Sequence, residues 1–129
     1  MVIADSYSTA TIAFCDIVGF TKMTSQMPPE EVVAFLNKFF TMIDGLVEDY
    51  DLEKIKTIGD CYMVAGGIPK SKKDHAELVV EFALELIERS SEYLYNNSPI
   101  SVRIGIHSGP VVAGVIGRTK LTYDVSKYY

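Results

Sequence analysis

Two aspartates stand at positions from which they could hold divalent cations. Asp16 follows the uncharged run Thr11–Cys15, and Asp60 follows Gly59 between two apolar segments. Carboxylates that project from neighbouring strand ends suit Mg²⁺ or Mn²⁺, which take oxygen ligands and keep several waters. Two such ions, about 3.5 to 4 Å apart, can stabilise the attacking and leaving oxygens of a phosphoryl displacement. The pair also has a purely structural explanation, because aspartate is common in turns and after strands.

The residues after Asp16 could complete a phosphate site. The backbone carbonyl of Ile17 is a candidate metal ligand, and Gly19 allows the chain to turn closely around phosphates with N–H groups directed at them. We therefore predict a phosphate-binding loop made of Val18, Gly19, Phe20 and Thr21. The sequence contains neither Gly-x-x-x-x-Gly-Lys-Ser/Thr nor Gly-x-Gly-x-x-Gly. A phosphate ligand is still compatible with the sequence, because a bound metal can supply positive charge.

The apolar residues predict the elements that position these side chains. Their spacing of three to four residues predicts helices over 29–50 and 76–87, the first of which begins with proline and acidic residues. Continuous or alternating apolar runs predict strands at 11–15, 54–58, 61–65, 100–106, 111–116 and 121–125.

This order of elements is typical of an α+β, ferredoxin-like split βαβ fold. Such a fold has an antiparallel sheet with helices on one face. Only Gly59 and Asp60 separate the second and third strands, which predicts a tight hairpin. Because the first strand lies beside a strand of this hairpin, we expect Asp16 and Asp60 to approach each other.

Length and composition predict a single globular domain over residues 1–129. The chain is 48% hydrophobic and has 12 Lys+Arg against 17 Asp+Glu, which gives a net charge of -5. This balance argues against disorder and against a nucleic-acid groove. No apolar run approaches the roughly 18 to 20 residues that span a bilayer. Cys15 and Cys61 are interpreted as reduced, buried thiols. Because thiols stay reduced in the cytosol, we expect the domain to be cytoplasmic.

Three sequence blocks, in order, resemble the catalytic domain of class III nucleotide cyclases. The resemblance covers about Tyr7 to Val125, which is most of the chain. The blocks are Phe14-Cys15-Asp16-Ile17-Val18-Gly19-Phe20-Thr21, Lys54-Ile55-Lys56-Thr57-Ile58-Gly59-Asp60-Cys61-Tyr62-Met63 and Arg103-Ile104-Gly105-Ile106-His107-Ser108-Gly109-Pro110-Val111.

The resemblance implies a specific enzyme, an adenylate cyclase that converts ATP to 3′,5′-cyclic AMP and pyrophosphate. It assigns Asp16 and Asp60 to two Mg²⁺ or Mn²⁺ ions, and Lys56 and Asp124 to the adenine. Lysine donates to adenine N1 and aspartate accepts from the 6-amino group, whereas guanine presents the opposite pattern. The family places its sites between two head-to-tail domains, so a homodimer is expected. A membrane or sensor region elsewhere in a parent protein is also compatible with the resemblance.

One departure from the family keeps other interpretations open. The family continues after this point with Trp-Gly, an asparagine and an arginine on a helix, and a later lysine. The present chain ends Ser126-Lys127-Tyr128-Tyr129 and has no tryptophan. We therefore expect the C-terminal third of the family domain to be absent. The alternatives are a catalytically impaired nucleotide- or metal-binding or dimerisation fragment, and a guanylate cyclase. A diguanylate cyclase shares only the fold plan, because its Gly-Gly-Asp/Glu-Glu-Phe block is missing.

Overall fold

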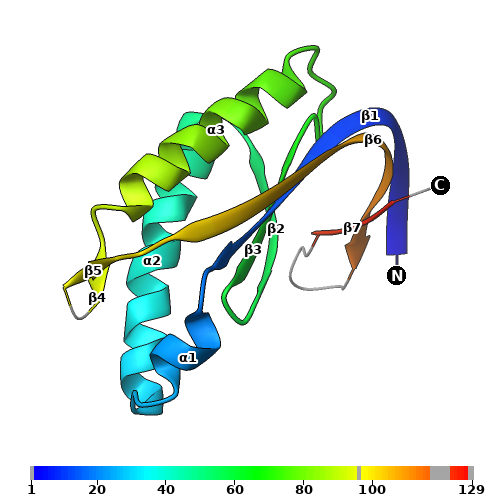
Figure 1. Cartoon of the computed structure of the whole chain (residues 1–129). Helices are drawn as coiled ribbons and strands as arrows, with labels where there is room; N and C mark the ends of the chain where they lie inside the picture. Colours follow the sequence, from blue (N-terminus) through cyan, green and yellow to red (C-terminus); the bar gives the residue numbers. More distant parts are fainter. Residues whose placement is uncertain (1, 96, 117–122, 128–129) are drawn as a thin grey trace.

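A five-stranded antiparallel sheet forms the centre of the protein (Figure 1). The computed structural model describes residues 2–95, 97–116 and 123–127, with side chains for 9–95 and 97–110. The sheet order is β2-β3-β1-β6-β7, and β4 and β5 form a separate short hairpin. The strands are β1 (Val2–Ile17), β2 (Glu53–Ile58), β3 (Cys61–Gly66), β4 (Leu94–Tyr95), β5 (Ser98–Pro99), β6 (Val102–Ile116) and β7 (Tyr123–Lys127).

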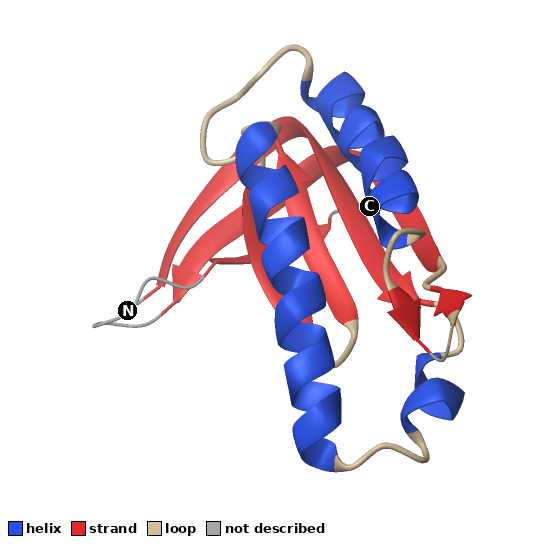
Figure 2. Cartoon of the chain, turned by 90° about the vertical axis from the view of Figure 1, so that its left-hand side faces the viewer, coloured by secondary structure: helices blue, strands red, loops and turns tan. Residues whose placement is uncertain are grey.

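Two long helices cover one face of this sheet and leave the other face without helices (Figure 2). They are α2 (Pro29–Asp49) and α3 (His75–Ser90), and the short α1 (Phe20–Thr24) follows the end of β1. Pro29 begins α2, and Glu30 and Glu31 lie in its first turn. Acidic side chains there stabilise the helix, because they interact favourably with the positive end of its dipole. The predicted α+β split βαβ fold is therefore confirmed. Among the described residues, no helix is long and apolar enough to cross a membrane.

The strands β1 and β6 are longer than the apolar runs predict. They pair antiparallel from Val2↔Ile116 to Ile17↔Val102. The sequence predicts a separate extended segment at 111–116, but β6 continues through Pro110 without a break. The register between the two strands shifts where Tyr7 and Ala10 of β1 face this part of β6. Such a bulge accommodates a proline, which cannot donate a ladder hydrogen bond, and this is why the predicted break is absent.

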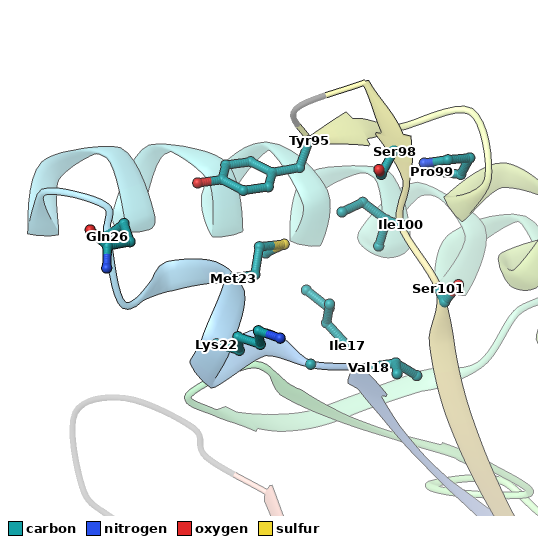
Figure 3. Close-up of a pocket in the computed structure, with 11 residues that line it drawn as sticks. Ile17, Val18, Lys22, Met23, Gln26, Tyr95, Ser98, Pro99, Ile100 and Ser101 are labelled. Carbon is teal, nitrogen blue, oxygen red and sulfur yellow. The ribbon is translucent and has the colours of Figure 1, made fainter.

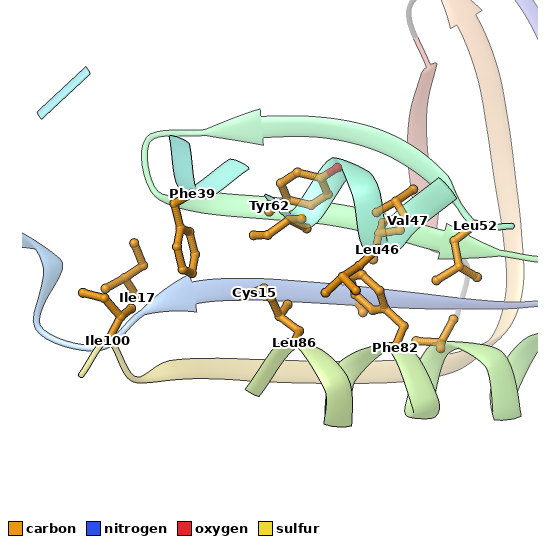
Figure 4. Packing of buried hydrophobic residues seen from close by; sticks show 14 residues of the cluster. Cys15, Ile17, Phe39, Leu46, Val47, Leu52, Tyr62, Phe82, Leu86 and Ile100 are labelled. Carbon is orange, nitrogen blue, oxygen red and sulfur yellow. The ribbon is translucent and has the colours of Figure 1, made fainter. Parts of the chain in front are cut away.

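The main hydrophobic core lies between the sheet and the two long helices (Figure 4). Phe39 and Phe82 supply its largest apolar side chains, and each is about 1% exposed. Tyr62 is equally buried, and its hydroxyl donates to Asp44 Oδ1 at 2.5 Å. The buried members of the cluster are Ala13, Cys15, Ile17, Phe39, Ile43, Leu46, Val47, Leu52, Tyr62, Val64, Val79, Phe82, Leu86 and Ile100. This core fixes β1 and β3 against α2 and α3, and with them the strand ends that carry the candidate site.

The sheet curls so that its two edge strands approach each other. β2 and β7 lie at opposite ends of the strand order, yet Cα atoms of the two strands lie within 8 Å. In Figure 1, β7 runs beneath the arch formed by β1 and β6. The predicted strand at 121–125 overlaps β7, and its residues 121 and 122 lie outside the described part of the chain. The curl gives the face that bears no helix a concave form.

Candidate active site

The structure brings Asp16 and Asp60 to the same corner of the sheet, as predicted. Gly59 adopts φ +57°, so the two-residue loop between Ile58 and Cys61 turns tightly and Asp60 lies at its tip. The Oδ2 atom of Asp60 accepts a hydrogen bond from the backbone N–H of Ile17 at 3.0 Å. This bond holds the hairpin tip against the end of β1. The backbone of Ile17, the residue that follows Asp16, therefore orients Asp60.

Asp16 is paired with a residue that we did not single out from the sequence, Arg103. The two residues are register partners on β1 and β6. Arg103 donates from Nε to Oδ1 and from Nη2 to Oδ2 of Asp16, each at 3.1 Å. The carboxylate raises the pKa of Arg103 above its ordinary value. No local signal in the sequence pointed to Arg103, because it occupies a polar position in the alternating pattern formed by Val102, Ile104 and Ile106.

The donor set at this corner fits a hard divalent cation. Two carboxylates from neighbouring strands offer the oxygen ligands that Mg²⁺ and Mn²⁺ prefer. Within the part of the chain that the structure describes, no three His, Cys, Asp or Glu side chains gather closely enough to hold a metal ion. A cation at Asp16 and Asp60 would therefore need further oxygens from water or from a ligand. Such incomplete protein coordination is usual where the cation also binds substrate phosphates.

Lys56, the predicted adenine contact, lies on the same face of the sheet as Asp16. Lys56 opposes Met63, and Met63 opposes Phe14, which is two residues from Asp16 on β1. Side chains opposite each other, or two apart on one strand, share a face. All four residues therefore lie on the face without helices, where the side chain of Phe14 is 43% exposed.

The backbone of Asp124, the second predicted base contact, lies in β7 opposite Gly114 of β6. Its side chain is outside the described part of the structure. Because the sheet curls, the strand that carries Asp124 approaches β2, the strand that carries Lys56. The two residues predicted to select the base are thus on strands brought together by the curl.

The predicted phosphate-binding loop is part strand end and part helix. Gly19 has φ +70°, and Phe20 and Thr21 begin α1. The N–H of Val18 is not available to a phosphate, because it donates to the carbonyl of Ser101 at 2.9 Å. Val18 can therefore contribute no free N–H to the predicted loop. The first N–H groups of α1 lack partners within the helix and remain candidates.

A cavity of about 500 Å³ lies beside the predicted phosphate-binding loop, on the side away from Asp16 and Asp60 (Figure 3). Ile17 and Met23 form part of its apolar lining, and Lys22 and Tyr95 lie at its wall. Neither Asp16 nor Asp60 lines it. The cavity is therefore separate from the aspartate corner, which opens onto the face of the sheet without helices.

The two cysteines are free thiols, as predicted, but only one is fully buried. Cys15 is 3% exposed, whereas Cys61 is partly exposed. Burial, with smaller contributions from Asp16, Cys61 and Asp60, raises the pKa of Cys15 to about 12. Burial and the same two aspartates also raise the pKa of Cys61. Both thiols are therefore poor nucleophiles, because the thiolate is the reactive form.

We expect these thiols to resist labelling in the folded chain. At pH 8, far below a pKa of about 12, Cys15 carries almost no thiolate, so an aromatic disulfide reagent should not modify it. Cys61 should react slowly, and both should react within minutes in urea. Mass spectrometry of digested protein assigns each modification. Rapid modification of Cys15 in the native chain would contradict the buried position.

His75 has a structural position at the start of α3. Its Nδ1 atom lies 2.6 Å from Oγ1 of Thr11, which in turn lies 2.7 Å from Oγ of Ser108. Thr11 is fully buried. These bonds connect the first turn of α3 to β1 and β6. They satisfy a buried hydroxyl and give His75 no position at the aspartate corner.

The fold and the site together define the class of protein. Residues 2–127 match the family of adenylate and guanylate cyclase catalytic domains. The chain belongs to this family. It therefore has a class III cyclase catalytic fold, with the two aspartates at a corner of the sheet.

Similar proteins include cyclases named for each of the two nucleotides. An adenylate cyclase of Mycobacterium tuberculosis is 41% identical over 96% of this chain, which covers 28% of that protein. A receptor-type guanylate cyclase of Caenorhabditis elegans is 43% identical over 88% of the chain, which covers 9% of that protein. The chain thus spans less than a third of the length of these relatives.

A solved structure shows the same architecture. A dimeric guanylyl cyclase domain from the fungus Blastocladiella emersonii superposes with a TM-score of 0.90 and is 34% identical. The alignment covers 98% of this chain and 71% of the fungal one. Sequence identity therefore does not separate adenylate from guanylate cyclases among these proteins.

Proposed function

We propose that the chain is the catalytic domain of an adenylate cyclase, which forms 3′,5′-cyclic AMP and pyrophosphate from ATP. The observation that carries this proposal is the convergence of Asp16 and Asp60 at one corner of the sheet, on the face that also carries Lys56. In the reaction, a bond forms between the ribose 3′-oxygen and the α-phosphorus. The bond from that phosphorus to the pyrophosphate oxygen breaks, pyrophosphate leaves with the electron pair of that bond, and the proton of the 3′-hydroxyl passes to solvent.

Asp16 and Asp60 would hold two Mg²⁺ or Mn²⁺ ions, with the Ile17 carbonyl as a further ligand. When bound, such ions polarise phosphoryl oxygens, neutralise the triphosphate and favour the ionised 3′-hydroxyl. The chain supplies position: the N–H of Ile17 orients Asp60, and the register of β1 and β6 sets the direction of Asp16. Gly19 and the start of α1 would adjoin the phosphates. This division of labour suits phosphoryl transfer, which depends mainly on positioning and charge neutralisation.

The choice of ATP is supported by the hydrogen-bonding character of two residues. Lys56 only donates and ionised Asp124 only accepts, which matches N1 and the 6-amino group of adenine. Guanine has a donor at N1 and an acceptor at O6, so both contacts would be mismatched. The approach of β7 to β2 supports a shared role for the two residues.

The complete site is proposed to form between two chains in a head-to-tail homodimer. The candidate residues lie on the face without helices, which presents exposed apolar side chains such as Phe14 and Ile58. A second copy that covers this face would bury those side chains and exclude water from the nucleotide. One chain would supply Asp16 and Asp60, and the other would supply Lys56 and Asp124. A cytoplasmic location, where ATP is available, agrees with this role.

A guanylate cyclase is the second candidate, because guanylate cyclases are as similar to the chain as adenylate cyclases are. Incubating the 129-residue chain with ATP or GTP and Mn²⁺ distinguishes the two. We expect cyclic AMP to form with at least about tenfold higher kcat/KM than cyclic GMP, since mismatched base contacts are costly. Equal or faster use of GTP would reverse the assignment of the nucleotide. A chain that binds Mn²⁺ and nucleotide but forms neither product would instead be the impaired binding or dimerisation fragment.

A further inference from the structure

Arg103 occupies the carboxylate oxygens that the proposed cation site requires. Its guanidinium contacts both Oδ1 and Oδ2 of Asp16 at 3.1 Å in a bidentate arrangement. Guanidinium groups match carboxylates in this geometry, and such charged pairs are stronger than single neutral hydrogen bonds. Arg103 has no acceptor atoms and stays protonated, so it cannot coordinate a cation itself. A cation at Asp16 would meet another positive charge held at the same two oxygens.

The surroundings of the pair allow it to open without disturbance of the fold. The side chain of Arg103 is 70% exposed, whereas that of Asp16 is 34% exposed. The strands beneath are fixed, because Asp16 and Arg103 are register partners and Ile17 pairs with Val102 next to them. Arg103 can therefore rotate into solvent while the backbone of Asp16 stays in place. The other aspartate stays oriented by the N–H of Ile17.

We propose that Arg103 is a latch on the cation site: it closes Asp16 when no divalent ion is bound and is displaced when one binds. The inference rests on the proposed role of Asp16 as a metal ligand. With this latch, metal binding is an exchange in which the divalent ion replaces the guanidinium of Arg103 at Asp16. The latch lowers the affinity for a free divalent ion, and it prevents two carboxylates at one corner from repelling each other while the site is empty of metal.

Metal binding without nucleotide tests the latch. Mn²⁺ is titrated into the chain, and free Mn²⁺ is measured from its electron paramagnetic resonance signal. R103Q removes the guanidinium, and R89Q is the matched control. Arg89 is also exposed and also pairs with a carboxylate, that of Glu85 on the same helix, so its substitution makes the same change in net charge away from the site. A third variant, D60N, tests whether binding occurs at the aspartate corner.

We expect R103Q to bind Mn²⁺ about three- to tenfold more tightly than the unmodified chain, since exposed but bidentate ion pairs have this strength. R89Q should change the affinity less than about twofold, because its ion pair is exposed and lies away from the site. If R103Q binds no more tightly than R89Q while D60N still weakens binding, the latch is wrong and the metal site stands. If D60N and the unmodified chain bind Mn²⁺ equally, the metal site is wrong, and the latch with it.

A second measurement follows the latch in the unmodified chain. The side-chain Nε–H of Arg103 gives its own nitrogen-15 resonance, which R103Q identifies by its disappearance. While the pair is closed, this proton exchanges slowly with water because it is hydrogen-bonded to Asp16 Oδ1. Saturating Mg²⁺ should increase its exchange rate at least severalfold and leave the Nε–H of Arg89 unchanged. An unaltered exchange rate for Arg103 under saturating Mg²⁺ would overturn the displacement.

Discussion

Replacing Asp60 by asparagine is expected to lower the metal-dependent formation of cyclic AMP at least about 100-fold. Asparagine keeps an oxygen that can accept the hydrogen bond from Ile17 N–H, so the hairpin tip stays against β1. What is lost is the negative charge that holds the cation. Metal ions contribute several kcal/mol to the stabilisation of charge in phosphoryl transfer, and about 3 kcal/mol corresponds to a 100-fold change in rate. Asp16→Asn should have a similar effect.

The control for this experiment is Asp51→Asn. Asp51 lies outside the site, has φ +54° and pairs with Lys72. Asparagine tolerates this backbone conformation, so the variant removes one negative charge with little strain. We expect its kcat/KM to stay within about threefold of that of the unmodified chain, because an exposed ion pair contributes little to stability. Steady-state rates over a range of Mn²⁺ concentrations, with thermal unfolding of each variant, give the comparison. Activity of Asp60→Asn close to that of Asp51→Asn would exclude the metal role.

The second large effect is expected from the two residues that are proposed to contact the nucleotide base. The double variant Lys56→Glu with Asp124→Cys should shift the ratio of kcat/KM for ATP to that for GTP at least about 100-fold toward GTP, as expected when a hydrogen-bond pattern is reversed. Glutamate accepts from guanine N1–H and the 2-amino group, and loss of the aspartate removes an acceptor that opposes guanine O6. Sites built for one hydrogen-bond pattern reject the opposite pattern by large factors, because buried polar groups are left unpaired.

Lys54→Glu is the matched control for this exchange. Lys54 lies on the same strand but on the opposite face, where its Nζ is 3.1 Å from Oδ1 of Asp44 and lies over the ring of Tyr62. The change in charge is the same as at Lys56, and the lost ion pair is exposed. The ATP-to-GTP ratio should therefore change less than about threefold, in keeping with the small energies of exposed pairs. A comparable shift in both variants would mean that the overall charge of the strand, and not a base contact, controls the preference.

Local patterns were sufficient to predict the two long helices, the β2–β3 hairpin and the corner where the aspartates meet, but not α1 or the β4–β5 hairpin. The apolar spacing over 29–50 corresponds to α2, and Gly59-Asp60 forms the tight loop that the sequence indicated. The length of β1 was not predictable in this way. Its outer half, from Val2 to Thr9, is polar in places and gains its strand conformation from pairing with β6. Pro110 likewise suggested the end of a strand. A proline at a bulge cannot be distinguished from a proline after a strand until the partner strand is known.

The parts of the site that escaped prediction depend on contacts across long stretches of sequence. Arg103 and Asp16 are paired only because β6 adopts one register against β1, and a shift of one residue would place Arg103 on the opposite face. The approach of β7 to β2 depends on the curl of the whole sheet. The engaged N–H of Val18 depends on Ser101 in the segment that leads into β6. None of these contacts has a local signature.

The pairing of β1 with β6 also determines the order in which the chain can fold. β1 leaves the ribosome before the two strands that flank it, β3 and β6, and its Val2 pairs with the distant Ile116. The β2–β3 hairpin and the two long helices need only local contacts, so they can form earlier. Until β6 is made, one side of β1 presents unpaired N–H and C=O groups to the cell. We therefore expect completion of the sheet, and with it the alignment of Arg103 with Asp16, to be a late step in folding.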